Sequence, residues 1–255
     1  MSAAADTQPH ASRLATPVTL RIGALTGNGT FLVKENGLST GWTNEYGNVI
    51  QGAVSGQLIG VLTGTGHYLV KQGGLSASWV NEYSGVKEGV ISAATGSAPL
   101  RIGVLTSNGT FLVKQGGLSA GWTTEYTGVT QGALSGNLIG VLTSGGRFLV
   151  KQGGLSASWV DEYSNVTEGV VSAATARTPL RIGVLTGSGL FLVKQGGLSA
   201  GWTTEYGNVA QGMVSGDLIG VRTAAGDFLV KQGGLSAGWT TEYSGVAQGA
   251  LWSAL

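Results

Sequence analysis

The chain has 255 residues and a net charge of +1, and only 11% of its residues are charged, well below the roughly 25% usual for soluble domains. No cluster of Lys or Arg occurs, so the electrostatic footprint of nucleic-acid binding is absent, and the lack of cysteine excludes disulfides and thiolate metal sites. No run approaches 18 apolar residues, so we expect no membrane insertion.

The first residues, 1–16, are polar and rich in alanine, and we expect them to form a flexible tail. They contain no apolar segment of the kind that a signal peptide needs. As written, the sequence therefore favours the cytoplasm, or secretion by a route that it does not encode, and the compartment stays open. The rest of the chain, 17–255, is expected to form a single domain.

One segment occurs six times: Lys-Gln-Gly-Gly-Leu-Ser-Ala, then Gly or Ser, then Trp-x-x-Glu-Tyr, with small changes in the first copy. The spacing between its tryptophans alternates between 37 and 43 residues. A fixed period in this range is the mark of repeat architectures. The expected repeats lie near 20–57, 58–99, 100–137, 138–179, 180–217 and 218–255.

Each repeat contains four short strand patterns, which we call A, B, C and D. In one copy they are residues 129–135, 138–143, 148–152 and 158–163. B and C are joined by a tight turn, which is Asn28-Gly29 in the first copy, and Asn-Gly between apolar runs is the strongest short hairpin signal. B and C are apolar on both faces, which suits sheets that are covered on both sides.

Four antiparallel strands per unit, repeated six times, predict an all-β fold, a six-bladed β-propeller of four-stranded antiparallel blades. Two β-trefoils would need two groups of three repeats on unlike patterns, and a β-solenoid would need shorter coils. The chain starts at strand B, in 20–26, and ends with a spare strand A, in 246–252. We expect this C-terminal strand to pair into the N-terminal blade and close the ring, which removes two exposed sheet edges.

The six copies differ at one end of the expected blades and agree at the other. The residue after the B–C turn is Thr30, His67, Thr110, Arg147, Leu190 or Asp227. The C–D loop is Gly-Gly-Leu-Ser in five copies and Asn-Gly-Leu-Ser in the first. Backbone geometry and a ligand pocket are both possible reasons for this constancy.

The constant segment also supplies the candidate binding residues, a Lys on strand C and a Trp, Glu and Tyr on strand D. A Trp face beside a carboxylate and an amine suits a sugar, although a structural Lys–Glu pair and core packing of the Trp are the simpler alternatives. Alternation along strand D puts Trp and Tyr on one face and Glu on the other, so a pocket would draw on two blades. The candidates are Lys34, Trp42, Glu45, Tyr46, Lys71, Trp79, Glu82, Tyr83, Lys114, Trp122, Glu125, Tyr126, Lys151, Trp159, Glu162, Tyr163, Lys194, Trp202, Glu205, Tyr206, Lys231, Trp239, Glu242 and Tyr243.

A second set follows a three-fold alternation. Arg21, Arg101 and Arg181 occur on strand B only in alternate repeats. On strand A, Glu88 and Glu168 alternate with Gln51, Gln131 and Gln211, and these side chains are expected to line a central channel. The pattern leaves open three sites of one kind and three of another.

Catalytic chemistry has little support, since there is no nucleophile–base pair, no metal cluster and no phosphate loop. The only histidines are His10, in the expected tail, and His67, at a varying turn. We therefore expect no enzyme activity, no cofactor and no metal site.

The piece Leu138-Ile-Gly-Val-Leu-Thr-Ser-Gly-Gly-Arg-Phe-Leu-Val, followed by Trp159, resembles the repeat of propeller lectins of the tectonin and tachylectin type. The resemblance covers 20–255 and implies a propeller that binds carbohydrate. The layout is also similar to six-bladed fucose-binding lectins, but their recurrent Arg is found here at most as Arg21, Arg101 and Arg181. The WD40 signature is absent.

The sequence thus predicts a multivalent carbohydrate-binding protein with repeated sites between blades near the C–D loops. Its expected partners are glycans or glycoconjugates on a cell surface, with no nucleic acid, and the chain would be a monomer or a small homo-oligomer. The alternative is a non-catalytic structural or protein-interaction scaffold with a consensus-like repeat.

Overall fold

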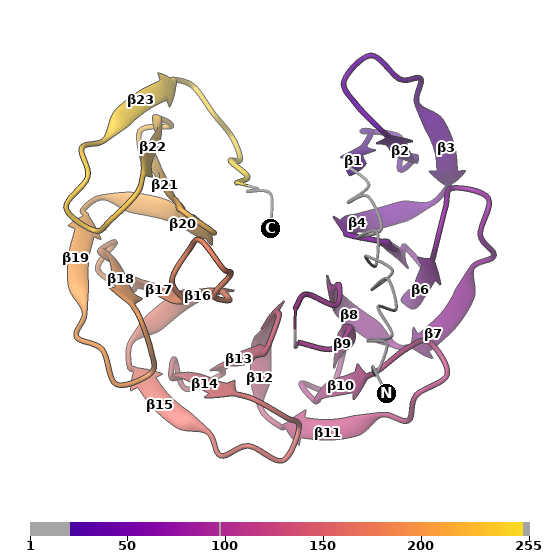
Figure 1. Ribbon diagram of the computed structural model, residues 1–255, viewed down its shortest axis with the longest axis horizontal. Coiled ribbons are helices and arrows are strands. Elements are labelled where there is room, and N and C mark those ends of the chain that lie inside the picture. The colour runs from indigo at the N-terminus through magenta and orange to yellow at the C-terminus, as the bar shows by residue number, and fades with distance from the viewer. Residues whose placement is uncertain (1–20, 97, 252–255) are drawn as a thin grey trace, which may run out of the picture.

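The computed structural model describes residues 21–96 and 98–251. They form twenty-three strands in six antiparallel sheets around a central space (Figure 1). The predicted all-β propeller of repeated blades is confirmed. No helix of the described part is long and apolar enough to cross a membrane. The tail expected at 1–16 lies outside the described residues.

The sheets are blades 1 to 6 in chain order; blades 2 to 6 are meanders of strands A to D from the centre outward, and blade 1 has strands B to D. The A strands are β4 (Val49–Ser55), β8 (Val86–Ser92), β12 (Val129–Ser135), β16 (Val166–Ser172) and β20 (Val209–Ser215). The B strands are β1 (Arg21–Leu25), β5 (Leu58–Thr63), β9 (Arg101–Thr106), β13 (Leu138–Thr143), β17 (Arg181–Thr186) and β21 (Leu218–Thr223). The C strands are β2 (Phe31–Glu35), β6 (His67–Gln72), β10 (Phe111–Gln115), β14 (Phe148–Gln152), β18 (Phe191–Gln195) and β22 (Phe228–Gln232). The D strands are β3 (Thr43–Tyr46), β7 (Val80–Ser84), β11 (Thr123–Tyr126), β15 (Val160–Tyr163), β19 (Thr203–Tyr206) and β23 (Thr240–Tyr243).

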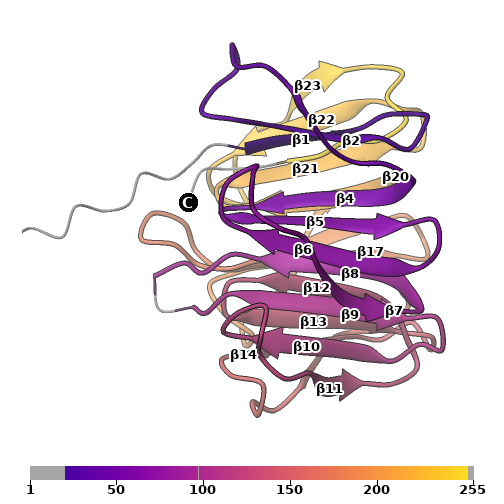
Figure 2. The same cartoon turned by 90° about the vertical axis from the view of Figure 1, so that its right-hand side faces the viewer.

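The meander sorts the connections onto two ends of the strands, as the side view shows (Figure 2). The A–B turns and C–D loops lie at one end, and the B–C turns and D–A connections lie at the other. At the B–C turns, glycine takes a left-handed conformation, with φ of 79° at Gly29 and 78° at Gly66. The sequence prediction of tight hairpins at these positions is therefore confirmed.

The predicted closure of the ring is not formed. Blade 1 contains only β1, β2 and β3, and residues 246–251 are not in a strand, so the ring is open between blades 1 and 6 (Figure 1). Residues 246–251 still follow the path of an inner strand beside blade 6. The Gly249 N–H donates to Gln211 Oε1 at 3.0 Å, as the Gly169 N–H donates to Gln131 Oε1 at 3.0 Å. Residues 246–251 contact β20 through a side chain of that strand, Gln211. Their backbone forms no hydrogen bond with β1.

Neighbouring blades pack through an aromatic ring from strand C and a glycine in strand A of the next blade. Phe111 of β10 lies on Gly132 of β12, so that a Cβ atom at Gly132 would overlap the ring. Tyr68 and Gly89, and Phe148 and Gly169, repeat this contact. The B and C strands lie between blades and are buried on both faces, which explains their continuous apolar pattern.

We expect Gly132→Ala to lower the free energy of unfolding by about 1–3 kcal/mol, the usual cost of overpacking, because Phe111 must move. Gly121→Ala is the control, since no atom lies within 4 Å of the added Cβ there. Its effect should stay within about 0.5 kcal/mol in urea denaturation. Equal effects of the two substitutions would contradict this packing.

Candidate functional site

The candidate residues gather in buried groups between blades, which we call interblade clusters. The cluster between blades 2 and 3 contains Glu82 and Tyr83 of blade 2 and Lys114 and Trp122 of blade 3. Lys114 Nζ forms an ion pair with Glu82 Oε2, donates to the Leu118 carbonyl at 2.5 Å and lies 5.0 Å from the Trp122 ring centroid. Tyr83 meets Trp122 edge-on, with 5.5 Å between centroids.

Five interfaces contain this cluster, counting the one between blades 2 and 3. The other ion pairs are Glu45–Lys71, Glu125–Lys151, Glu162–Lys194 and Glu205–Lys231. The other aromatic pairs are Tyr46–Trp79, Tyr126–Trp159, Tyr163–Trp202 and Tyr206–Trp239. Twenty of the twenty-four candidate residues are thus brought together, always from two adjacent blades.

The charges of each cluster face each other. The side chains of Lys114 and Glu82 are 4% and 1% exposed. Burial raises the pKa of Glu82, although the hydrogen bond and the charge of Lys114 act in the opposite direction. The second oxygen, Oε1, is buried without a hydrogen-bond partner among the described residues. The pair is therefore a buried ion pair between blades, and the cross-strand pair on an outer edge considered from the sequence is not formed.

A β-bulge explains how strand D serves this cluster. In blade 1, Phe31 pairs with Tyr46 but Leu32 pairs with Asn44, so Glu45 is the extra residue. The bulge lets Glu45 and Tyr46 both contact blade 2, whereas simple alternation placed them on opposite faces. Trp of each copy faces the preceding blade, so the expectation that Trp and Glu serve different interfaces is confirmed.

The four remaining candidates lie at the two ends of the open ring. Lys34 and Trp42 belong to blade 1, and Glu242 and Tyr243 belong to blade 6. Trp42 is 47% exposed and Tyr243 is 69% exposed, and within the described ranges neither Lys34 nor Glu242 forms an ion pair. The ends carry the two halves of a sixth interblade cluster.

The three-fold arginines join blades in a different way. Arg101 of blade 3 is 1% exposed; its Nη1 donates to the Gly136 carbonyl of blade 4 at 3.0 Å and its Nη2 donates to the Gly153 carbonyl. Arg21 and Arg181 make the same contacts with the next blade. The alternation therefore creates two kinds of interface, because only odd-numbered blades reach forward with an arginine.

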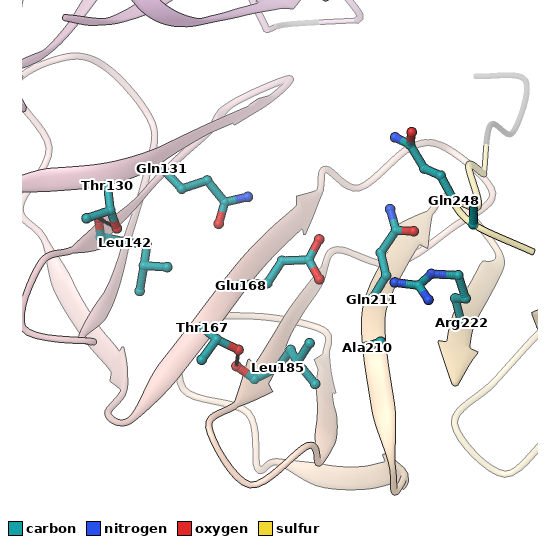
Figure 3. Close-up of a pocket in the computed structure, with 11 residues that line it drawn as sticks. Thr130, Gln131, Leu142, Thr167, Glu168, Leu185, Ala210, Gln211, Arg222 and Gln248 are labelled. Carbon is teal, nitrogen blue, oxygen red and sulfur yellow. Dashed lines mark hydrogen bonds between the residues drawn. The ribbon is translucent and has the colours of Figure 1, made fainter. Parts of the chain in front are cut away.

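The polar residues of strand A line a cavity of about 610 Å³ beside the central space (Figure 3). Glu168 Oε2 accepts from the Gly212 N–H of the next blade at 2.9 Å, and Glu88 Oε2 accepts from Gly132 at 3.2 Å. Burial raises the pKa of both carboxyls. Their place beside the channel agrees with the sequence, but Arg222, which also lines this cavity, was missed because it is not repeated.

Comparisons with known proteins show the fold alone. The chain is similar to the crystal structure of Prp20p from Saccharomyces cerevisiae, described with its binding properties to Gsp1p and histones, at 8% identity and a TM-score of 0.64, over 83% of this chain and 69% of that one. It is similar to YCF48 bound to D1 peptide, at 13% identity and a TM-score of 0.54, over 90% and 87%. Hsv2 of Kluyvelomyces marxianus matches at 11% identity and a TM-score of 0.55, over 84% and 69%. No protein-family model and no curated protein matches the chain.

These comparisons correct the predicted partners. The neighbours Prp20p and YCF48 are named with protein or peptide partners, which contradicts the expectation of glycans as the partners. One neighbour binds histones, which package DNA, so the exclusion of nucleic acid from composition is withdrawn as well. The propeller part of the resemblance is confirmed, but the likeness to lectins is not. Ligand binding by the cluster residues stays a prediction.

We expect Glu82→Gln to lower the free energy of unfolding by about 3–5 kcal/mol, because it leaves the Lys114 ammonium buried without a carboxylate. Asp161→Asn is the control, since the Arg147–Asp161 pair is 57% and 43% exposed and its loss should hardly change the unfolding transition. Chemical denaturation of both variants measures the difference. Similar losses in the two would rule out a structural role for the buried pair.

The halves of the sixth cluster are expected to meet in solution, because joining them buries Trp42 and Tyr243 and covers two sheet edges. Lys34→Met and Glu242→Gln should then show a coupling energy of about 0.5–3 kcal/mol in a double-mutant cycle. If light scattering shows a monomeric mass, the contact forms within one chain and not between two chains. Additive effects of the two substitutions would mean that the ends stay apart.

Proposed function

We propose that this chain is a non-catalytic β-propeller that binds a protein partner through the end of the strands that carries the B–C turns and D–A connections. We call this end the variable face, and its characteristic residues are Ile50, His67, Arg147, Leu190 and Asp227. The proposal rests on one contrast. The Lys, Glu, Tyr and Trp held constant in the repeats contact one another between blades, whereas the residues that differ lie at this end, where Ile50, Arg147 and Leu190 are exposed.

The side chains that follow the B–C turns make different local contacts in different blades. His67 Nδ1 lies 3.1 Å from Ser84 Oγ, Arg147 pairs with Asp161, and Asp227 Oδ1 accepts from Ser244 Oγ at 2.7 Å. Repeat proteins that vary on one face while keeping a constant interior commonly bind through the varied face.

The variable face also has the composition of a protein-binding surface. Ile50 is 61% exposed and Leu190 is 40% exposed, and the Arg147 side chain is 57% exposed. Exposed apolar side chains and arginine are both common in protein interfaces, where arginine is a frequent energetic centre. Support of a second kind comes from the neighbours, since Prp20p is named with Gsp1p and histones and YCF48 with a bound peptide.

The test uses substitutions to residues that already occur at equivalent positions of other blades. Phage-displayed random dodecapeptides are selected on the full chain and their affinities measured by calorimetry. The face variant is Ile50→Thr, Arg147→Thr, Asp161→Thr and Leu190→Thr, in which each new residue already stands at the equivalent position of another blade. Because the fold tolerates these residues elsewhere, we expect a folded protein that binds the selected peptides at least roughly tenfold more weakly.

The control variant, Gln72→Ala with Gln152→Ala, changes two exposed residues beside the C–D loops. It should keep the affinity of the parent chain. Selection of no peptide, or peptides whose binding depends on the control positions and not on the face variant, would overturn the proposal.

A further inference from the structure

Arg222 breaks the repeat at a position that is otherwise apolar. The other five copies have leucine there: Leu25, Leu62, Leu105, Leu142 and Leu185. In the four copies with a blade on either side the leucine is buried, from 0% exposed at Leu105 to 6% at Leu185, whereas Leu25, at the open end of the ring, is 41% exposed. Arg222 lies at the end of β21 and pairs in register with Gln211 of β20. Arg222 as a whole is half-buried, but its Nε is buried, and burying that donor without a hydrogen bond costs free energy.

The described residues do not supply that partner. Arg222 Nε is buried and has no hydrogen-bond partner among them, and no carboxylate lies within ion-pair distance. Glu168 shares the cavity and accepts from the Gly212 N–H; burial raises its pKa, and the charge of Arg222 lowers it from beyond ion-pair distance. Figure 3 shows the Arg222 guanidinium beside Gln211, with the Glu168 carboxylate on the other side of Gln211 and the Gln248 amide pointing away from Arg222.

The cavity offers free donors beside the Glu168 carboxylate. Gln131 accepts the Gly169 N–H through Oε1, which leaves its amide N–H groups available, and Gln248 is exposed. A guanidinium presents paired N–H groups in a plane that matches a carboxylate in a bidentate arrangement. A volume of about 610 Å³ lies in the range of ligand sites and can take one or two side chains of a docked segment.

The cavity opens at the same end as the variable face. Thr130 and Gln131 begin strand A of blade 4, whereas Leu142 and Arg222 end B strands, so all four lie next to the B–C turns and D–A connections. A chain segment of a protein held on that face can therefore reach Arg222.

We propose that the cavity at Arg222 is a carboxylate-binding site that holds an acidic side chain of a partner protein's segment. The site rests on the proposed function, and it names the chemistry that the partner must present. The fork of Arg222 receives the carboxylate, in a cavity that Gln248 also lines.

The test compares two labelled peptides, acetylated tetraglutamate amide and acetylated tetraglutamine amide, by fluorescence anisotropy on the full chain at low salt. We expect tetraglutamate to bind at least roughly tenfold more tightly, with the preference falling as salt is added. Arg222→Leu should remove the preference. Because leucine is the residue of the five other copies, this variant should fold with unchanged or higher thermal stability.

Two further variants separate a built site from general attraction of charge. Arg222→Lys keeps the charge but not the fork, so it should retain only part of the preference. Arg177→Ala removes one exposed positive charge near the A–B turns and should change nothing. Equal affinity for the two peptides, an unaffected Arg222→Leu variant or an equal loss in Arg177→Ala would each overturn the site. If the carboxylate site fails but the peptides selected from the library still bind more weakly to the face variant, the proposed function stands without that site.

Discussion

The buried Lys–Glu ion pair between neighbouring blades is the interaction on which the rest of the ring depends. Each pair lies out of solvent and joins strand C of one blade to strand D of the preceding one, so either charge alone would be left buried. Its geometry needs the bulge at Glu45 and its copies and the edge-on contact of Tyr with Trp. It also needs a backbone carbonyl of the C–D loop, Leu118 in blade 3, that accepts from the lysine ammonium. These requirements account for the constancy of the C–D loop and strand D.

A second layer of contacts gives the ring its alternation. Arg21, Arg101 and Arg181 reach from odd-numbered blades to two carbonyls of the next blade, and the even-numbered blades have leucine at the start of strand B. The alternating spacing of 37 and 43 residues therefore reflects two kinds of blade interface. It need not reflect two kinds of ligand site.

Because the interior contacts use the constant residues, variation is left to the opposite end of the strands. The B–C turns carry apolar, basic and acidic side chains in different blades, and the one unpaired arginine of the channel cavity lies at this same end. The six blades share one backbone arrangement, but the side chains on the variable face differ from blade to blade. We place the function on the variable face because the constant residues hold the blades together and the differing residues lie there.

The sequence by itself determined the strands, their order and the six-fold repeat, because hairpin turns and apolar runs are local signals, as Gly29 and the B and C strands show. It also identified the residues of the interblade clusters and the need for two blades to build each one. Only the tertiary structure decided that Lys114 and Glu82 face each other out of solvent, since burial depends on the neighbouring blade. Local alternation misplaced Tyr46 because a bulge is set by the pairing of β2 with β3, and comparison of the copies passed over Arg222 because its cavity is built by three blades.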